Sequence, residues 1–413
     1  MGKFIFQFIV LFLFWYTNAK SKRSFMTSSS WLIGIYMISA LCGIFEFKLG
    51  GYQIPNDIEF WYPILAFTAS ILLFLLPFRM FHEEKVRTIV VPNKNILDLC
   101  STIIIILSFY SIIFYSQTVI GIFSYGDLGY LRDARYSEGG EYFESGLMNT
   151  IASVSASLYV FALLLFFIYA SLGVDPKRRK LLLLSSLSEP IHIMAFVGRD
   201  GVVFWLFSFV FFFLIFKPYL NKSYIKVNKK KIILLFIALM VPFLAITSGR
   251  FEDSDSGVGG SIISYMGHSF VYGPLFFNLE NPPYIHLSSF PLIREIFNIP
   301  APVTDMIEMG EWRSWCFSTF IVGLIRNFGY LVTYLIGIIL IVVSLCTFGK
   351  PSKSLKFNDM IMSILYFQII GQGVFYFRQY TRGGNLFIVM SIVLYFVFKQ
   401  NCKRNTITLY RHP

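Results

Sequence analysis

Long apolar runs bounded by charged residues recur along the whole chain, with about one run in every 30 residues. Most of these runs are close to the roughly 20 residues that an α-helix needs to cross a bilayer. The pattern therefore predicts an all-α polytopic membrane protein, with 1–413 forming a single transmembrane domain. We expect about eleven transmembrane helices, near 4–19, 31–47, 60–78, 96–116, 147–172, 181–197, 201–216, 232–248, 317–348, 359–377 and 386–398.

The composition excludes an ordinary soluble globule. Hydrophobic residues make up 56% of the chain and charged residues 14%, against about a quarter charged in soluble domains. The cysteines, at positions 42, 100, 316, 346 and 402, lie mostly inside apolar runs and lack metal-ligand spacing. Neither a disulfide framework nor a zinc site is therefore expected.

The basic residues predict the orientation. If the spans alternate, the segments on one side are 20–30, 79–95, 173–180, 217–231, 349–358 and 399–413, and they hold 24 of the 35 Lys and Arg residues. Cytoplasmic loops carry such an excess, so the amino terminus is expected outside and the carboxy terminus inside. The net charge of +12 is then explained by basic residues that face anionic lipid headgroups, and binding to nucleic acid is not needed to explain it.

A cleaved signal peptide is the alternative for the first run, because Lys3 precedes a short apolar stretch that ends in Thr17-Asn18-Ala19. Cleavage would leave Lys20, Lys22 and Arg23 outside. That placement goes against the positive-inside rule, which favours a retained first span.

Two long loops are expected outside, at 117–146 and 249–316, the second with short helices across the mouth of the bundle. The outer side uses Arg rather than Lys: besides Lys3 and Lys48 it carries only Arg132, Arg135, Arg199, Arg250, Arg294, Arg313, Arg326, Arg378 and Arg382. A topology signal needs only charge, whereas the planar fork of Arg matches phosphate and carboxylate oxygens. This choice indicates an anionic ligand on the outer side.

Several of these arginines lie at span ends, where charges are usually functional. Arg199 stands in the tight turn Gly198-Arg199-Asp200-Gly201, Arg250 follows a span, and Arg326 interrupts an apolar run. Arg378 and Arg382 share a second short outer turn. Ion pairs with neighbouring acids, or anchoring of the side chains at the lipid headgroups, are the alternatives.

Possible proton acceptors also fall on the outer side, namely His268, in the stretch that begins at Tyr265, and Glu252 beside Arg250. A solvated loop histidine is the alternative for His268. Glu189, followed by Pro190 and then His192, is a carboxylate inside a predicted span, and such residues mark either functional sites or packing contacts.

Three stretches together resemble the O-antigen polymerases, and more broadly the Wzy-type oligosaccharide repeat-unit polymerases. They are the Gly198–Gly201 turn before an apolar span, Ser248-Gly249-Arg250 leading into the large loop, and the run from Thr319-Phe320 to Asn327-Phe328-Gly329. Asn327 stands where Asp is common in that family. Members of that family have many spans, one dominant periplasmic loop and arginines at span ends. This chain resembles that arrangement over nearly its whole length.

The resemblance implies a GT-C-like, metal-independent glycosyltransferase in the bacterial inner membrane with its active site facing the periplasm. It would join undecaprenyl-pyrophosphate-linked repeat units into O-antigen or a related surface polysaccharide, with membrane lipids, a chain-length regulator and a flippase as partners and with no cofactor, metal or nucleic acid. The catalytic residues would be Arg199, Arg250, His268 and Glu252, and the substrate-binding residues Arg326, Arg378, Arg382, Arg132, Arg135 and Tyr265.

Three alternatives remain open. The related O-antigen ligases share this plan and carry a functional histidine in the large loop, a place that His268 fits. A lipid-linked oligosaccharide flippase would need polar groups along the bundle interior, whereas polar residues here concentrate in outer loops. A solute transporter would be expected to show two related halves, and no internal repeat is evident.

Overall fold

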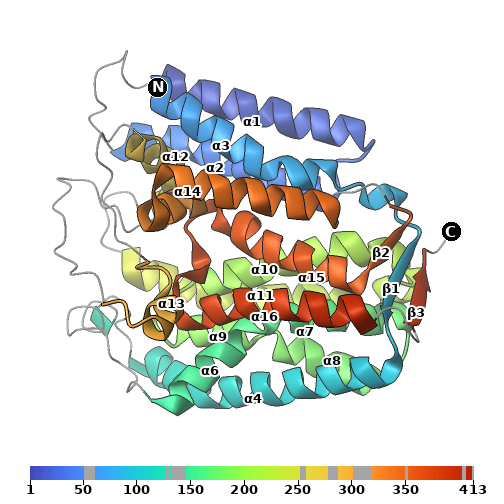
Figure 1. Ribbon diagram of the computed structural model, residues 1–413. Coiled ribbons are helices and arrows are strands. Elements are labelled where there is room, and N and C mark those ends of the chain that lie inside the picture. Colours follow the sequence, from blue (N-terminus) through green and yellow to red (C-terminus); the bar gives the residue numbers. More distant parts are fainter. Residues whose placement is uncertain are drawn as a thin grey trace. The chain divides into compact units, whose positions relative to one another are not determined.

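Figure 1 shows a computed structural model of the 413-residue chain. The residues that it describes are 1–50, 61–125, 128, 130–131, 146–251, 257–277, 287–300, 318–348, 352–401 and 406–411. Within these ranges the chain is mainly helical, which is compatible with the predicted all-α membrane protein, although it also contains three short strands that were not predicted. It divides into two compact units: unit 1 is Met1–Val86 with Gly259–Tyr395, and unit 2 is Arg87–Val258 with Phe396–Pro413.

The elements of unit 1 come from both ends of the chain. They are α1 (Gly2–Ser21), α2 (Ser28–Gly50), α3 (Trp61–Met80), α12 (Gly257–Phe276), α13 (Pro291–Ile296), α14 (Thr319–Cys346), β2 (Ser354–Lys356), α15 (Phe357–Tyr366) and α16 (Arg382–Asn401). The first residues of α12 and the last of α16 belong to unit 2.

Unit 2 is built mostly from the middle of the chain. Its elements are β1 (Thr88–Pro92), α4 (Lys94–Tyr125), α6 (Leu147–Ser157), α7 (Tyr159–Leu172), α8 (Pro176–Ser185), α9 (Ser188–Met194), α10 (Asp200–Phe216), α11 (Lys222–Phe251) and β3 (Thr406–Tyr410).

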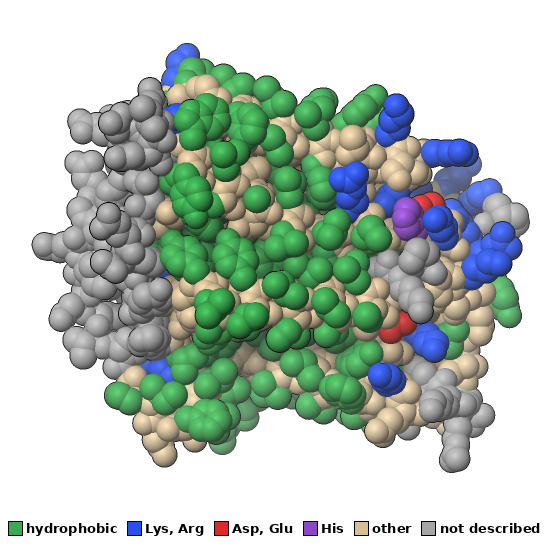
Figure 2. All heavy atoms as spheres, turned by 45° about the horizontal axis from the view of Figure 1, so that its top comes forward, with side chains coloured by type: hydrophobic (Ala, Val, Ile, Leu, Met, Phe, Trp, Pro, Cys, Tyr) green, Lys and Arg blue, Asp and Glu red, His purple; other side chains and the backbone are tan. Residues whose placement is uncertain are grey.

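Within the described ranges, 8 helices are long and apolar enough to cross a membrane, and the number is 9 if the bent pair α6–α7 is counted as one span. Their outward faces are apolar: Ile106 on α4, Leu234 on α11 and Leu331 on α14 are 62%, 66% and 75% exposed. Hydrophobic side chains are spread over the surface visible in Figure 2. Such surface is compatible with lipid and not with water, so the prediction of a membrane protein holds at this level.

The predicted number of eleven spans is not confirmed, because 181–197 and 359–377 do not form single long helices. The first region is divided into α8 and α9. Pro190 explains the break, since its ring would clash with the carbonyl of Ser186 in a continuous helix. At the break, the side-chain hydroxyl of Ser186 donates a hydrogen bond to the carbonyl of Leu183, at 2.6 Å.

The region 359–377 begins as α15 and then loosens into a π-helical turn at Phe367–Gly371 and a 3-10 turn at Gln372–Val374. Gly371 and Gly373 pack closely against neighbouring side chains. A Cβ atom at Gly373 would lie 2.7 Å from the Cβ of Phe320, and one at Gly371 would lie 2.8 Å from the Cδ1 of Leu32. These two glycines allow the backbone to lie close to α14 and α2, and the helix is irregular over the same residues.

Aromatic rings fill the cores of both units. In unit 1, Phe74 of α3 meets Phe320 of α14 edge to face, with centroids 5.0 Å apart. In unit 2, Phe167 of α7 packs on Phe209 and Phe216 of α10, at 5.3 and 5.8 Å. Because the surroundings of a membrane helix are as apolar as its core, such close packing, rather than burial from water, holds the helices together.

In unit 1 the Lys-rich ends of the helices meet. Lys22, which follows α1, donates from Nζ to Ser29 Oγ at 2.5 Å, to the Phe78 carbonyl at 3.2 Å and to the Phe81 carbonyl. Glu83 accepts from the backbone N–H of Ser28 at 2.9 Å. The predicted inside segments 20–30 and 79–95 therefore share one end of unit 1, as alternating spans require.

Unit 2 shows the same arrangement. Strand β1 pairs antiparallel with β3, with Val90 opposite Thr408, which joins segments 79–95 and 399–413. The guanidinium of Arg179 lies 4.7 Å from the ring centroid of Tyr224, which joins segments 173–180 and 217–231. Basic segments that are distant in sequence therefore gather at one end of this unit as well.

The two predicted outer loops are only partly described. Helix α4 continues to Tyr125, past its predicted end at residue 116, and takes up the start of the loop 117–146. Within the loop 249–316 the structure describes α12, which is 20 residues long, and α13, which has 6 residues. Helix α12 packs into unit 1: Phe270 lies edge to face against Phe67 of α3, at 5.8 Å.

Candidate functional site

Arg199 occupies the N-cap position of α10 and is only 4% exposed. The turn that holds it is closed by a hydrogen bond from the Gly198 N–H to the Ile193 carbonyl, at 3.0 Å. Both glycines of the turn are required for space, because a Cβ at Gly198 or Gly201 would come within 2.6 or 2.8 Å of the Ile193 side chain. A side chain so deeply buried does not reach out to lipid headgroups, which argues against the anchoring alternative.

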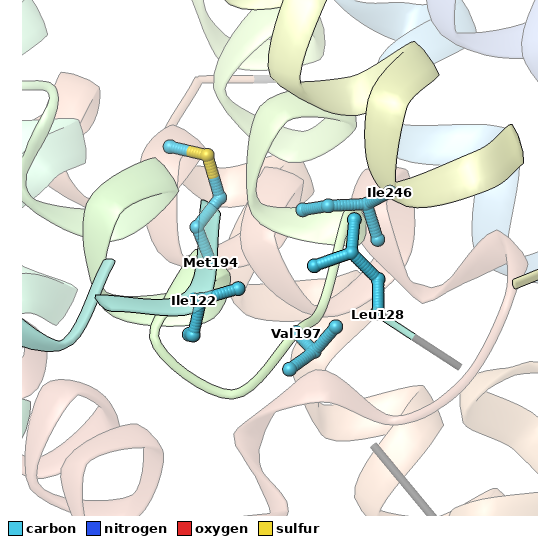
Figure 3. Close-up of a cluster of buried hydrophobic side chains, with 5 residues drawn as sticks. All are labelled: Ile122, Leu128, Met194, Val197 and Ile246. Atoms are coloured by element: carbon cyan, nitrogen blue, oxygen red, sulfur yellow. The ribbon is translucent and has the colours of Figure 1, made fainter. Parts of the chain in front are cut away.

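An apolar cluster fixes this turn beside the end of α11. Val197 packs with Ile122, Leu128, Met194 and Ile246, and Figure 3 shows these side chains converging from separate elements. Leu128 also lies against Gly249, where a Cβ would be 3.2 Å from its own Cβ. The Arg199 turn, the last turn of α11 and the last turn of α4, which holds Ile122, therefore meet within unit 2.

Four further predicted site residues lie in the chain at or just beyond the ends of α11 and α4 that meet here. Arg250 lies in the last turn of α11, and the backbone there is described while its side chain is not. Glu252, Arg132 and Arg135 lie outside the described residues. The predicted convergence of Arg199 and Arg250 on one ligand therefore stays a prediction, although the backbone brings their two elements together.

Glu189 and His192 lie on α9, close to the Arg199 turn. His192 Nδ1 is 3.6 Å from Glu189 Oε2, and the two side chains are 15% and 7% exposed. The ring of His192 packs between those of Tyr115 and Phe196, at 4.7 and 5.4 Å. This enclosure between aromatic rings fits the packing alternative for His192.

His268 lies in the middle of α12, in unit 1, and faces a carboxylate that the sequence analysis overlooked. Its Nδ1 is 3.2 Å from Oε1 of Glu46 on α2. The imidazole stacks on the ring of Tyr272, one turn further along α12, with centroids 4.0 Å apart. Glu46 could have been noticed in the sequence, because it is the only carboxylate in the predicted span 31–47.

The other predicted residues of unit 1 are placed near its irregular segments. Tyr265 contacts Phe375, with ring centroids 5.4 Å apart. Arg378 donates to the side-chain oxygen of Gln372 at 2.5 Å. Arg326 is partly buried in the second turn of α14.

Arg382 is the most exposed of these arginines. Its side chain is 55% exposed and pairs with Glu295 of α13, at 2.6 Å. An exposed pair of this kind contributes on the order of 0–1 kcal/mol to stability. The pair links α13 to the start of α16, and it leaves the guanidinium open to solvent on its other side.

Asn327 of α14 belongs to a hydrogen-bond network in unit 1 that centres on Ser289. Its Oδ1 accepts from the Ser289 N–H at 2.8 Å, and its Nδ2 donates to Ser289 Oγ at 2.9 Å. Asn385 of α16 donates to the Ser289 carbonyl at 3.0 Å and to the Gln379 carbonyl at 2.6 Å. An amide both donates and accepts, so Asn327 suits this structural network better than a carboxylate would.

The site residues named from the sequence therefore form two groups. Unit 2 holds Arg199 and the backbone of Arg250, and unit 1 holds His268, Tyr265, Arg326, Arg378 and Arg382. The structure adds Glu46 to the second group and assigns Asn327 a structural role. No protein-family model, curated protein or solved structure matches this chain.

Proposed function

We propose that this protein is a membrane glycosyltransferase of GT-C-like architecture that polymerises undecaprenyl-pyrophosphate-linked oligosaccharide repeat units into O-antigen or a related surface polysaccharide. The observation that carries the proposal is the burial of Arg199, 4% exposed, in a glycine-flanked turn at the amino end of a long apolar helix. A buried arginine at a span end is expensive, and such residues usually serve a ligand or a reaction.

The chemistry of the proposed reaction suits this arginine. Transfer of the glycan breaks the bond between the anomeric carbon and a phosphate oxygen, so negative charge develops on the leaving pyrophosphate. A guanidinium fork held in place beforehand stabilises that charge, and the amino end of α10 adds the positive end of its helix dipole. Arg250 supports the same role, because its helix ends beside the Arg199 turn.

The side of the membrane follows from the distribution of cations. In unit 2 the segments that carry Lys gather at one end, and the Arg199 turn with the end of α11 belongs to the opposite end. With the Lys-rich end in the cytoplasm, Arg199 faces the periplasm of a bacterial inner membrane. Lipid-linked repeat units delivered by a flippase, and a chain-length regulator, are then the expected partners.

The acceptor hydroxyl must lose a proton in the transfer, and the sequence offers His268 and Glu252 as acceptors. The hydrogen-bond distance between His268 and Glu46 supports His268. The same observation favours O-antigen ligase as the second candidate function, because a histidine in the large loop is expected there too. The arginine chemistry at the leaving pyrophosphate would be shared by both enzymes.

The surface polysaccharide of a strain lacking this protein tests the proposal and separates the two candidates. A polymerase defect leaves a single repeat unit attached to its final carrier. A ligase defect leaves long chains attached to undecaprenyl pyrophosphate. Unchanged surface polysaccharide, with normal chain lengths and attachment, would contradict both functions.

A further inference from the structure

A histidine–carboxylate pair lies wholly within unit 1, where α2 and α12 cross. Oε1 of Glu46 is 3.2 Å from Nδ1 of His268, and the two side chains are 4% and 16% exposed. The carboxylate is thus almost completely enclosed, whereas part of the imidazole remains reachable. Of the two groups, His268 is the one that a substrate could approach.

The close approach of the two helices depends on glycine. A Cβ atom at Gly267 would lie 2.5 Å from the backbone carbon and oxygen of Cys42, and one at Gly43 would lie 3.1 Å from the Cβ of Phe270. No side chain larger than hydrogen fits at Gly267, so the backbones touch there. This contact brings Glu46, about one turn beyond Cys42, against His268, the residue after Gly267.

The surroundings of the pair restrict its motion. Tyr272 stacks on the imidazole with an interplanar angle of 27°. Tyr272 also packs against an apolar cluster that contains Phe4, Ile44, Ile64 and Val271 from four helices. The histidine is therefore held by a carboxylate on one side and an aromatic ring on another, in a region of low polarity where a charge interaction is strong.

A second buried His–Glu pair of the described chain provides a comparison, whereas a third pair, His82 with Glu84 at 2.6 Å, is more exposed. In unit 2, His192 Nδ1 lies 3.6 Å from Glu189 Oε2, beyond a good hydrogen bond, although the exposures of the two histidines are nearly equal at 15% and 16%. His192 is packed between two aromatic rings. The His268 and His192 pairs thus match in composition and burial and differ in geometry.

We infer that Glu46 is a positioning residue for His268, and that the two form the proton-accepting pair of the transferase. The inference rests on the proposed function. With Nδ1 protonated and directed at Glu46, Nε2 of His268 takes the proton of the acceptor hydroxyl. The acceptor oxygen forms the new bond to the anomeric carbon, the bond to the phosphate oxygen breaks, and undecaprenyl pyrophosphate leaves with that electron pair. Glu46 stabilises the imidazolium and keeps its charge throughout.

The test uses the full-length purified protein and single lipid-linked repeat units isolated from the deletion strain. His268→Gln should lower kcat about a hundredfold or more, and Glu46→Gln about tenfold, with KM unchanged in both. The double variant should be no slower than His268→Gln, because a positioning residue acts only through its partner. Glu46→Asp keeps the charge and should retain more activity than Glu46→Gln. His192→Gln and Glu189→Gln are the matched controls and should keep wild-type kcat.

The outcomes separate the inference from the proposed function. If the wild-type protein does not elongate the repeat units, the proposed function fails. If the wild-type protein is active, the inference is overturned by full activity of Glu46→Gln, by losses that add in the double variant, or by an equal loss in His192→Gln. Each variant is compared at equal amounts of protein that elutes from size-exclusion chromatography as the wild type does. If Glu46→Gln does not fold, Glu46→Asp takes its place, alone and combined with His268→Gln.

Discussion

Arg178 and Asp98 form an ion pair, with Nη1 of the arginine 3.1 Å from Oδ1 of the carboxylate. The pair joins the first turn of α8 to the first turn of α4, two helices that start about 80 residues apart in the sequence. Each helix begins within a basic segment, α4 within 79–95 and α8 within 173–180, that the positive-inside rule predicts to be cytoplasmic. The contact therefore requires both segments to lie at the same end of unit 2.

The first prediction is the topology of the chain in the membrane. Alkaline phosphatase fused after Asn281 should be active, because the fusion point falls in the large outer loop, and fused after Ser223 it should be inactive. Activity measured in whole cells, at equal amounts of fusion protein, checks this. The reverse pattern would contradict the orientation and every site assignment that depends on it.

The second prediction concerns Lys22, which lies between α1 and α2 and whose pKa is lowered from 10.5 to about 8 by burial, opposed by the Glu83 and Glu84 carboxylates. Below pH 8 the folded and unfolded chains both hold this proton. Between pH 8 and 10.5 the unfolded chain holds it more strongly, so this group increases the stability as the pH rises, by at most roughly 3 kcal/mol.

Thermal unfolding in detergent across about pH 7.5 to 9.5 measures this effect against Lys22→Met. The methionine variant should be less stable near pH 7, by about 1–3 kcal/mol, because the Phe78 and Phe81 carbonyls lose their donor. The difference between wild type and variant should grow with pH. A difference that stays constant or shrinks would contradict the lowered pKa.

The third prediction tests the glycine contact between α2 and α12. Gly267→Ala should destabilise the protein by about 1–3 kcal/mol, because its Cβ would lie 2.5 Å from the Cys42 backbone. Gly259→Ala, on the same helix with nothing within 4 Å of the new Cβ, should instead be neutral or stabilising by up to about 1 kcal/mol. Unfolding midpoints in one detergent give both values, and equal effects of the two substitutions would argue against a tight crossing.

The fourth prediction concerns the guanidinium of Arg199. Arg199→Lys keeps the charge and removes the planar fork, so we expect a loss of about a hundredfold or more in the rate of chain elongation. Arg250→Lys should act in the same direction. Arg79→Lys is the control, because Arg79 lies at the Lys-rich end of unit 1 and contacts the Phe14 ring at 4.6 Å.

Complementation of the deletion strain, at matched levels of protein in the membrane, reads out the arginine variants. Arg79→Lys should restore full-length polysaccharide and Arg199→Lys should not. Restoration by both Arg199→Lys and Arg250→Lys would mean that these arginines only anchor or orient the chain.

The sequence predicts most of the helices because a membrane helix shows its apolar composition directly. It fails at 181–197 and 359–377, where the runs are equally apolar and the break depends on local chemistry. Pro190 with its preceding serines, and Gly371 with Gly373, are visible signals for these breaks. Hydropathy averages over such residues, so the runs read as continuous spans.

The candidate site is less accessible to sequence reasoning, because its pairs join distant parts of the chain. Arg199 could be selected from its glycine turn alone. Glu46 and His268 are separated by 222 residues, and nothing in the sequence indicates that α2 and α12 cross at Gly43 and Gly267. The structural role of Asn327 likewise depends on Ser289 and Asn385, which only the fold brings together.

The most direct test of the proposed function is elongation by the purified protein. Reconstituted in lipid and supplied with undecaprenyl-pyrophosphate-linked repeat units, it should release undecaprenyl pyrophosphate and produce a ladder of longer glycans that remain lipid-linked, without added divalent cation. The arginine-based account also predicts that a chelator leaves this activity unchanged. Absence of the ladder under these conditions would contradict the polymerase function, and activity that is lost in chelator and restored by magnesium would contradict stabilisation of the leaving group by arginine.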